Sequence, residues 1–412
     1  MIVRRATGGD AEAIAILLSK SFLEDTAVVR VSIENNPRYS LSNMYVLEDK
    51  NMFPGIIGCL RITPFEVFSR GVKMPMGGIA AVAVQPEARK RGTANALMED
   101  ALQRMYEMGY PVSMLFPFRH DFYRKFGYAY VGNVIQYDFS PANLLNFPER
   151  LHVRACSKSD RSTLKKILQQ EIQLDRSFTP IRNDNFWDLI VFPKFKDAYI
   201  YDDGETKGYI VFDLNKESTG NSGVFGQSVM SIKEFVALDA AANKGLWAFV
   251  GSLADQINHV KFLAPPDYPF HLYMKEPREL AFRRLFFEYK TFSTVASGFM
   301  LRVVDVQRAL SKLRHTLDVR TDFALRIDDG NLPQNTKTLN LHLHSGETIV
   351  EETKSPAKFQ ADIGVFSQIY SGFLKPSDAV RYGFAEAEPS IIGVLDELFR
   401  APSPFVYQFD IF

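Results

Sequence analysis

A strand, a basic turn and a helix follow one another between residues 77 and 108, and together they could bind a pyrophosphate. The apolar run Gly77–Val84 is typical of a buried strand. The turn Arg89–Gly92 carries three cationic side chains and a glycine, and the helical pattern Asn95–Met108 follows. The first turn of a helix has unpartnered amides that point at an anion, the helix dipole favours negative charge, and glycine lets the backbone approach closely. We therefore expect a phosphate-bearing ligand here.

The same features could form a solvated basic turn before an ordinary amphipathic helix, and the full spacing separates the two interpretations. The order Val82-x-Val84-x-Pro86-x-x-Arg89-x-x-Gly92-x-Ala94 is similar to the acetyl-CoA motif of the GCN5-related N-acetyltransferases. A Walker loop is excluded, because no Gly-Lys-Ser or Gly-Lys-Thr follows. The resemblance implies acetyl-CoA as co-substrate. The residues expected to bind it are Val82, Ala83, Val84, Arg89, Lys90, Arg91, Gly92, Thr93, Ala94 and Asn95.

A tyrosine on a short helix is the candidate general acid. Val112–Phe116 is predicted as the next buried strand, and Asp121–Tyr128 as a short helix ending at Gly127. In the superfamily that the motif resembles, a helix-borne tyrosine stands over the thioester sulfur, and the first tyrosine of Tyr-x-x-Phe-Gly-Tyr acts, which is Tyr123. A tyrosine of pKa about 10 stays protonated and can donate to a leaving thiolate of pKa about 8.5. The alternatives are Tyr128 as the acid, or a packing role for these rings.

Attack by an amine also needs a base, because an ammonium ion has no lone pair. Many members of the superfamily place a glutamate on the strand before the phosphate-binding turn, but Met76–Val84 contains no carboxylate. The tail Phe405–Phe412 is too apolar to be solvated, so we expect it to be buried. The α-carboxylate of Phe412 is therefore the candidate base. The alternative is that Phe412 only anchors the tail, and that Asp410 or solvent takes the proton.

The chain also contains an internal repeat. Val3–Asp10 aligns with Val153–Asp160 at a constant offset of 150 residues, and apolar positions of the following helices match as well. Both copies are predicted as a strand, a turn and a helix that begins at an aspartate. The pattern changes after residue 304, where strands are expected at Phe323–Ile327 and Leu339–Leu343. We infer three domains, at residues 1–150, 151–304 and 305–412.

These segments together resemble the enhanced intracellular survival (Eis) family of multi-site aminoglycoside acetyltransferases along nearly the whole chain. The segments that carry the resemblance are Val82–Pro86, Arg89–Gly92, Tyr123–Tyr128, Leu301–Val306 and Phe409–Phe412. The resemblance implies an α/β (α+β) architecture: tandem GCN5-related N-acetyltransferase folds, the second degenerate, and a C-terminal domain like sterol carrier proteins. It also implies that the tyrosine is the acid, that the terminal carboxylate is the base, and that the protein is a homo-oligomer, a hexamer.

The second copy departs from the motif at the phosphate-binding turn. Its counterpart, Asp239–Gly245, lacks the arginine pair. We therefore expect the second domain to bind no coenzyme A, and to contribute packing and a wall of the acceptor pocket.

The acceptor is expected to be a primary amine, on a small cationic molecule such as an aminoglycoside or polyamine, or on a lysine. Ammonium groups pair with carboxylates, and the candidates are Glu24 and Asp410, although either could be a surface acid. The alternative function is lipid or acyl-chain binding by the C-terminal domain.

Composition excludes several other classes. Lys plus Arg and Asp plus Glu both number 48, so no basic excess favours nucleic-acid binding. No apolar run is long enough to span a membrane, and the N-terminus does not resemble a signal peptide. Two cysteines cannot build a disulfide framework, which favours the cytoplasm. His342 and His344 share a strand face without a third ligand nearby, so we predict no metal.

Overall fold

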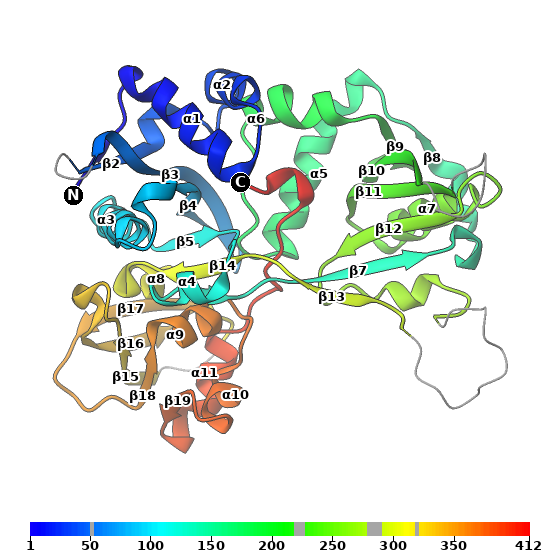
Figure 1. The fold of residues 1–412 in the computed structure, drawn as a ribbon. Coiled ribbons are helices and arrows are strands. Elements are labelled where there is room, and N and C mark those ends of the chain that lie inside the picture. Colours follow the sequence, from blue (N-terminus) through cyan, green and yellow to red (C-terminus); the bar gives the residue numbers. More distant parts are fainter. Residues whose placement is uncertain (50–52, 218–226, 278–290, 318–320) are drawn as a thin grey trace.

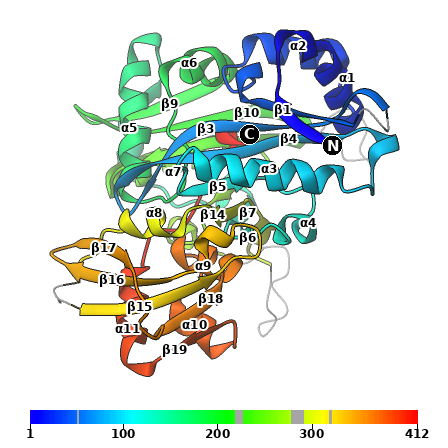
Figure 2. The same cartoon turned by 90° about the vertical axis from the view of Figure 1, so that its left-hand side faces the viewer.

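The computed structural model describes residues 1–49, 53–217, 227–277, 291–317 and 321–412. Its strands form three sheets packed with helices (Figure 1 and, turned by 90°, Figure 2). The first sheet has the order β1-β2-β3-β4-β5-β14-β6. Its strands are β1 (Ile2–Arg5), β2 (Met44–Asp49), β3 (Phe53–Ser69), β4 (Val72–Val84), β5 (Val112–Leu115), β14 (Met300–Val303) and β6 (Ala129–Tyr130).

Helices pack on both faces of this first sheet. Side chains of α1 (Ala11–Phe22), with α2 (Thr26–Asn35) beside it, cover one face, and α3 (Thr93–Glu107) covers the other. Strands β4 and β5 run parallel, which requires a crossover connection, and α3 supplies it. Leu97, Ala101 and Met105 of α3 are fully buried, as the apolar periodicity of this segment predicts. The short helix α4 (His120–Arg124) follows β5.

The second sheet repeats this plan with the order β13-β7-β12-β11-β10-β9-β8. Its parallel pair is β11 and β12, and the crossover helix α7 joins them. The strands are β13 (Thr294–Ser297), β7 (Asn133–Phe139), β12 (His259–Ala264), β11 (Gln227–Ala237), β10 (Thr206–Glu217), β9 (Asp197–Asp202) and β8 (Val153–Ala155). The α-helices are α5 (Arg161–Leu174), α6 (Asp184–Phe186) and α7 (Ala240–Gly251).

The internal repeat extends to matched ion pairs. Arg4 of β1 binds both Asp10, at 2.8 Å, and Glu48 of β2. Arg154 of β8 binds Asp160, at 2.9 Å, and Asp202 of β9. Both aspartates also accept a hydrogen bond from the backbone N–H three residues earlier, at 2.7 Å in each copy. The aligned octets therefore adopt one local structure with the same side-chain contacts.

Two strands lie in sheets that the inferred domain boundaries do not predict. Strand β7 precedes residue 150, yet it pairs with β12 and β13 of the second sheet. The boundary at residue 304 assigns strand β14 to the second domain, but this strand lies between β5 and β6 of the first sheet. The chain crosses between the sheets at residues 131–132 and again at 298–299, where the Gly298 N–H donates to the Gly132 carbonyl at 2.6 Å. The boundaries at 150 and 304 thus do not separate the two sheets.

The C-terminal domain contains the third sheet, with the order β17-β16-β15-β18-β19. Its strands are β17 (Glu347–Glu352), β16 (Thr338–His344), β15 (Thr321–Asp328), β18 (Phe359–Asp362) and β19 (Ala385–Ala387). Its helices are α8 (Val306–Ser311), α9 (Ile363–Tyr370), α10 (Pro376–Arg381) and α11 (Ile392–Leu398). The strands expected at Phe323–Ile327 and Leu339–Leu343 are β15 and β16.

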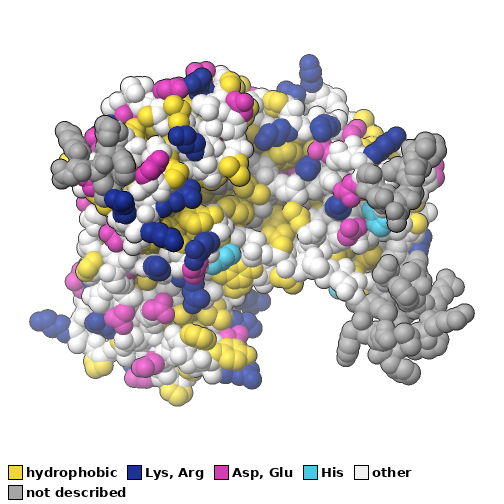
Figure 3. Space-filling view, viewed as in Figure 1, with side chains coloured by type: hydrophobic (Ala, Val, Ile, Leu, Met, Phe, Trp, Pro, Cys, Tyr) yellow, Lys and Arg dark blue, Asp and Glu magenta, His cyan; other side chains and the backbone are white. Residues whose placement is uncertain are grey.

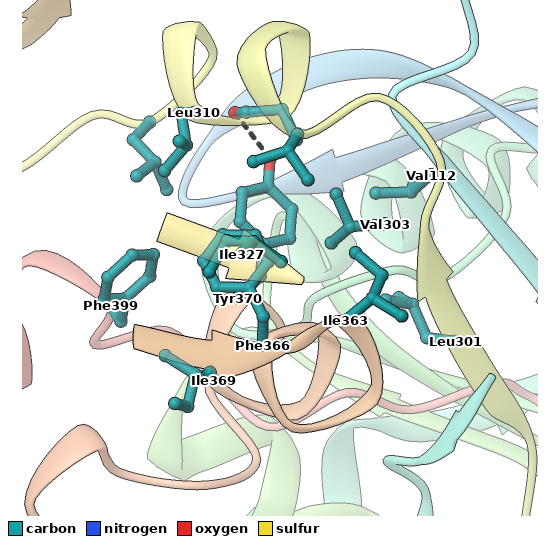
Figure 4. Packing of buried hydrophobic residues seen from close by; sticks show 14 of the residues in the cluster. Val112, Leu301, Val303, Leu310, Ile327, Ile363, Phe366, Ile369, Tyr370 and Phe399 are labelled. Atoms are coloured by element: carbon teal, nitrogen blue, oxygen red, sulfur yellow. Dashed lines mark hydrogen bonds between the residues drawn. The ribbon is translucent and has the colours of Figure 1, made fainter. Parts of the chain in front are cut away.

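One hydrophobic cluster joins this domain to the first sheet (Figure 4). Val112 and Val303 of the first sheet belong to it together with Phe366 and Tyr370 of α9. The Tyr370 hydroxyl is buried and donates to the carbonyl of Ala309 at 3.0 Å. Apolar side chains therefore fill the space between α9 and the first sheet.

After α11 the chain returns to the first domain. The tail runs between the two larger domains and ends beside β3 and β4 (Figure 1). Phe405, Tyr407 and Phe409 are each less than 10% exposed, so the predicted burial is confirmed for these residues of the tail, whereas Ile411 is 51% exposed. The Thr179 hydroxyl donates to the carbonyl of Phe405 at 2.5 Å and ties the tail to the second domain. Among the described residues, no helix is both long enough and apolar enough to span a bilayer.

Candidate active site

The predicted phosphate-binding turn leaves the N-terminus of α3 open. Gly92 precedes the helix with φ at +83°, a left-handed conformation that glycine adopts without strain. No side chain caps this helix end, so its first amides are available to a ligand. Arg89, Lys90 and Arg91 are exposed around it. The Thr93 hydroxyl donates to the carbonyl of Ala88 at 3.0 Å and fixes the turn. These residues fit a pyrophosphate.

The corresponding helix of the second domain is closed. Asp239 precedes α7, and its carboxylate accepts a hydrogen bond from the Ala242 N–H at 2.8 Å. A carboxylate at this position satisfies the amide and repels a phosphate. The difference between the two helix ends agrees with the eroded motif in the sequence.

Strands β4 and β5 diverge beside the turn. They pair over only four positions, from Met76 with Val112 to Ile79 with Leu115. Strand β4 continues to Val84, still paired with β3 on its other edge. Ala81 has a φ of +52°, and the β3–β4 register shifts between Cys59 and Arg61, so the strand carries an irregularity at this point. The backbone of Val82–Val84 therefore has a β5-facing edge available to a ligand.

Tyr123 lies on helix α4, which follows β5 in the chain, and its ring belongs to an aromatic cluster. It is 3% exposed, and its ring lies 5.3 Å from that of Phe118 and 5.0 Å from that of Phe122. Burial raises the pKa of Tyr123 above its ordinary value, which keeps the hydroxyl protonated at neutral pH. Within the described ranges its hydroxyl makes no hydrogen bond. The Tyr128 hydroxyl, in contrast, bonds to Ser113 Oγ at 2.6 Å.

The last residue of the chain lies on the first sheet. The ring of Phe412 packs against Phe65 of β3 and against Phe116, which follows β5, with centroids 4.6 and 6.4 Å away. Gly78 of β4 lies beneath it, and a Cβ there would be 2.8 Å from the Phe412 ring and 2.5 Å from Phe65. The β4 strand thus has no side chain at the position where the tail ends. The absence of a carboxylate on this strand is visible in the sequence, whereas the role of Gly78 is not.

Asp410, one of the two predicted acceptor contacts, anchors the tail. It is fully buried, and Arg182 donates to both of its oxygens at 2.9 Å. Arg38 donates to its carboxylate at 3.3 Å and to its carbonyl at 3.2 Å. Arg182 also binds Glu234, and although burial opposes it, the two carboxylates hold the pKa of Arg182 well above its ordinary value. Asp410 thus forms ion pairs with two arginines, and its contact with an acceptor stays a prediction.

Glu24, the other predicted acceptor contact, is exposed in the loop between α1 and α2.

A hollow of about 420 Å³ borders Phe65, and Arg38, Arg182 and Phe186 also line it. Figure 3 shows the front face of the molecule hollowed between the two larger domains, with hydrophobic side chains inside the hollow.

Family comparisons agree with this architecture. Residues 2–131 and residues 180–303 each match an acetyltransferase (GNAT) domain model, and these matches together cover more than half of the chain. Residues 306–407 match a sterol carrier protein domain. An uncharacterized N-acetyltransferase of Streptomyces avermitilis is 24% identical over 280 residues, which span 64% of each chain.

Solved structures share the complete fold. A GCN5-related N-acetyltransferase from Anabaena variabilis superposes with a TM-score of 0.85, at 22% identity, over 100% of both chains. Eis1 from Mycobacterium abscessus gives a TM-score of 0.76 at 19% identity, over 98% of this chain and 99% of that one. The chain belongs to the GCN5-related N-acetyltransferase superfamily. Its two acetyltransferase domains, followed by a sterol carrier domain, give it the architecture of the Eis family.

Proposed function

We propose that the protein is an acetyl-CoA-dependent N-acetyltransferase that acetylates a primary amine of a cationic small molecule or a lysine. The observation that carries the proposal is the open N-terminus of α3, with three exposed cationic residues, inside a segment that matches an acetyltransferase domain. Acetyl-CoA would supply an activated acetyl thioester. The turn Arg89–Asn95 would hold its pyrophosphate, and the free edge of Val82–Val84 would orient the chain that carries the thioester.

Tyr123 would act as the general acid. Its hydroxyl is protonated and not engaged by the described residues, so it can donate to the thiolate that leaves when the amine attacks. Tyr128 is less suited to this role because its hydroxyl is committed to Ser113.

The carboxylate of Phe412 would accept the proton of the attacking amine. The Phe412 ring is wedged between Phe65 and Phe116, and two residues earlier the carboxylate of Asp410 is held by Arg182. These contacts fix the position of the chain end. An ordinary α-carboxylate has a pKa of about 3.5 and is deprotonated at neutral pH, so it is able to accept a proton.

We also propose that the protein is a cytoplasmic homo-oligomer, a hexamer by its resemblance to the Eis family. Four apolar side chains around α1 and α2 are more than half exposed, and they are Phe22, Leu23, Val28 and Val31. Such a patch on an isolated chain would be covered in an assembly.

Lipid carriage is not favoured as the function. The sterol carrier domain turns the apolar side chains of α9 toward the first sheet, and the shared cluster fills the space between them (Figure 4). The tail that leaves this domain is committed to the first domain as well.

A panel of amines tests the proposal through release of coenzyme A. The panel would contain an aminoglycoside, spermidine, a lysine peptide and amines without further charge. We expect acetyl transfer to at least one primary amine, with the acetylated nitrogen identified by mass spectrometry. Failure of every amine to accelerate release of coenzyme A, in protein that binds acetyl-CoA, would contradict the proposal.

A further inference from the structure

A buried ion pair joins the C-terminal domain to the first sheet. The side chains of Arg302, on β14, and of Asp329, which follows β15, are fully buried. Arg302 Nη2 donates to both oxygens of Asp329, at 2.9 and 2.7 Å. The same carboxylate accepts from the backbone N–H groups of Asn331 and Leu332 and from the side-chain amide of Asn335. Asp329 is therefore fixed by its own domain, and it fixes the guanidinium of Arg302.

The ion pair leaves part of the guanidinium without a hydrogen bond. Nε and Nη1 of Arg302 are buried and have no hydrogen-bond partner within the part of the chain that the structure describes. Buried donors without partners lower stability, and replacement of a buried ion pair by apolar side chains is often neutral or stabilising. Stability of the fold is therefore a weak explanation for an arginine at this position.

The guanidinium lies beside the turn that ends α4. Gly127 in this turn has a φ of +75°, and a Cβ there would overlap Nη1 of Arg302. The same Cβ would lie 2.7 Å from Cγ2 of Ile363, on α9 of the C-terminal domain. The guanidinium thus fills the space that a side chain would take, and it contacts the backbone of the turn directly.

This turn is bonded to the backbone of Tyr123. The Tyr123 carbonyl accepts from the N–H groups of Phe126, at 3.0 Å, and Tyr128, at 3.3 Å. The Gly127 N–H donates to the carbonyl of Arg124 at 3.0 Å. Because α4 has only five residues, a shift of the turn would shift the whole helix and the Tyr123 side chain with it.

Arg302 also belongs to a row of paired residues across the first sheet. Gly77 of β4 pairs with Ser113 of β5, and Ser113 pairs with Arg302. Ser113 Oγ donates to the Gly77 carbonyl at 2.7 Å, and it therefore accepts from the Tyr128 hydroxyl, because a serine has one hydrogen to donate. The ring of Tyr128 lies 6.2 Å from that of Tyr123. The same row thus also fixes the ring against which Tyr123 packs.

We propose that Arg302 is a positioning residue for acetyl transfer: Asp329 holds its guanidinium, which supports the turn at Gly127 and so fixes the hydroxyl of Tyr123. The inference rests on the proposed role of Tyr123 as the general acid. It gives the C-terminal domain a part in catalysis that is separate from that of its tail.

Arg302→Lys keeps a positive charge near Asp329 but removes the planar group beside Gly127. We expect kcat for acetylation of an amine substrate to fall roughly ten- to hundred-fold, because a displacement of about 1 Å in a reacting group can cost that much. The dissociation constant of acetyl-CoA, measured by calorimetry, should stay near the wild-type value, since the turn at Arg89–Gly92 is unchanged.

Arg308→Lys is the matched control. Arg308 also binds an aspartate, Asp305, at 3.2 Å, and its guanidinium also lies beside a glycine. That glycine is Gly109, which follows α3 and not α4. We expect this variant to keep the wild-type kcat.

A double variant separates positioning from a general structural role. If Arg302 acts through the hydroxyl of Tyr123, Arg302→Lys should lower kcat little further in Tyr123→Phe, where that hydroxyl is already absent. An equal fall in both backgrounds would overturn the inference. A wild-type kcat in Arg302→Lys alone would also overturn it and leave the proposed function intact. A wild-type kcat in Tyr123→Phe, or a chain that acetylates no amine, would contradict the proposed function, and the inference would fail with it.

Asp329→Asn tests the same contact from the C-terminal domain, and it gives an answer even if Arg302→Lys does not fold. Asparagine keeps the oxygen that accepts from Asn331 and Leu332 but removes the charge that holds the guanidinium. We expect a smaller fall in kcat than in Arg302→Lys, with unchanged affinity for acetyl-CoA and no further fall in Tyr123→Phe. A wild-type kcat in Asp329→Asn would overturn the proposal.

Discussion

The ring of Phe412 packs against the ring of Phe65, with 4.6 Å between the centroids and 43° between the planes. The two residues are separated by almost the whole chain, yet the contact brings the terminal carboxylate to the sheet that carries the proposed acetyl-CoA site. Gly78 makes room for both rings, because a Cβ at that position would overlap each of them.

Adding one glycine after Phe412 should abolish most of the activity. The extension leaves the ring in place but converts its carboxylate into an amide and moves the charge one residue outward. Loss of a catalytic base lowers kcat by roughly 10²–10⁴-fold. The measurement is release of coenzyme A, with acetyl-CoA binding by calorimetry as the control for folding. Normal turnover by the extended enzyme would eliminate the terminal carboxylate as the base.

Charge reversal at the open helix end should abolish binding of acetyl-CoA. Arg91→Glu places a carboxylate beside the pyrophosphate, whereas Lys244→Glu changes the second domain, where Asp239 already caps α7. Calorimetry should give one site per chain in the wild type and in Lys244→Glu, and greatly weakened binding in Arg91→Glu. Two equivalent sites per chain would contradict the assignment.

Tyr123→Phe should lower kcat by roughly 10²–10⁴-fold, because only the proton donor is removed and the ring packing is kept. The dissociation constant of acetyl-CoA should stay near the wild-type value. Tyr128→Phe is the matched control, and it should cost about 1 kcal/mol of stability through the lost bond to Ser113, with less effect on rate. A wild-type kcat in Tyr123→Phe would move the acid to Tyr128 or to water.

The repeated aspartates should make a pH-dependent contribution to stability. The hydrogen bond from Arg4 and those from Thr7 lower the pKa of Asp10, so its contribution is fully present above the unfolded pKa of about 4. That contribution is lost as the pH falls from about 4 toward the lowered folded pKa. We expect Asp10→Asn, and likewise Asp160→Asn, to cost about 0.2–1 kcal/mol at pH 7, because each loses its ion pair with a partly exposed arginine. Thermal unfolding at pH 7 and at pH 3 should show the difference from wild type shrinking, and a constant difference would argue against the ion pair.

Light scattering at micromolar concentration should give the mass of a hexamer. The exposed apolar side chains of α1 and α2 would be covered in that assembly. Replacing Leu23, which is 93% exposed, with aspartate should lower the mass if this patch forms an interface. A monomer mass for the wild type would contradict the proposed assembly.

Local patterns were sufficient to predict the strand, turn and helix that carry the proposed site. The strand, turn and helix around Gly92 depend on neighbours in sequence, and burial of the tail follows from its composition. The internal repeat was visible because the aligned octets share their residue pattern at a constant spacing. The contacts within each octet are local as well, since Arg4 and Asp10, like Arg154 and Asp160, lie six residues apart and bind each other.

Long-range contacts could not be predicted in this way. Asp410 resembles a free acid in the sequence, and its partner Arg38 lies 372 residues away. The requirement for Gly78 depends on a ring that arrives from the opposite end of the chain. The exchange of β7 and β14 between sheets also left no local signal, since either strand would satisfy the same apolar pattern in either sheet.

The place of β14 in the first sheet has a consequence for synthesis. Strand β14 begins about 170 residues after β6, the strand that it separates from β5. A ribosome that adds roughly 5–20 residues per second needs roughly 10–30 s to produce that interval. During this time the nascent first domain has an open sheet edge at β5, next to the strands proposed to hold acetyl-CoA. The first acetyltransferase domain is therefore completed only after the second domain has left the ribosome, although most of its own sequence was translated first.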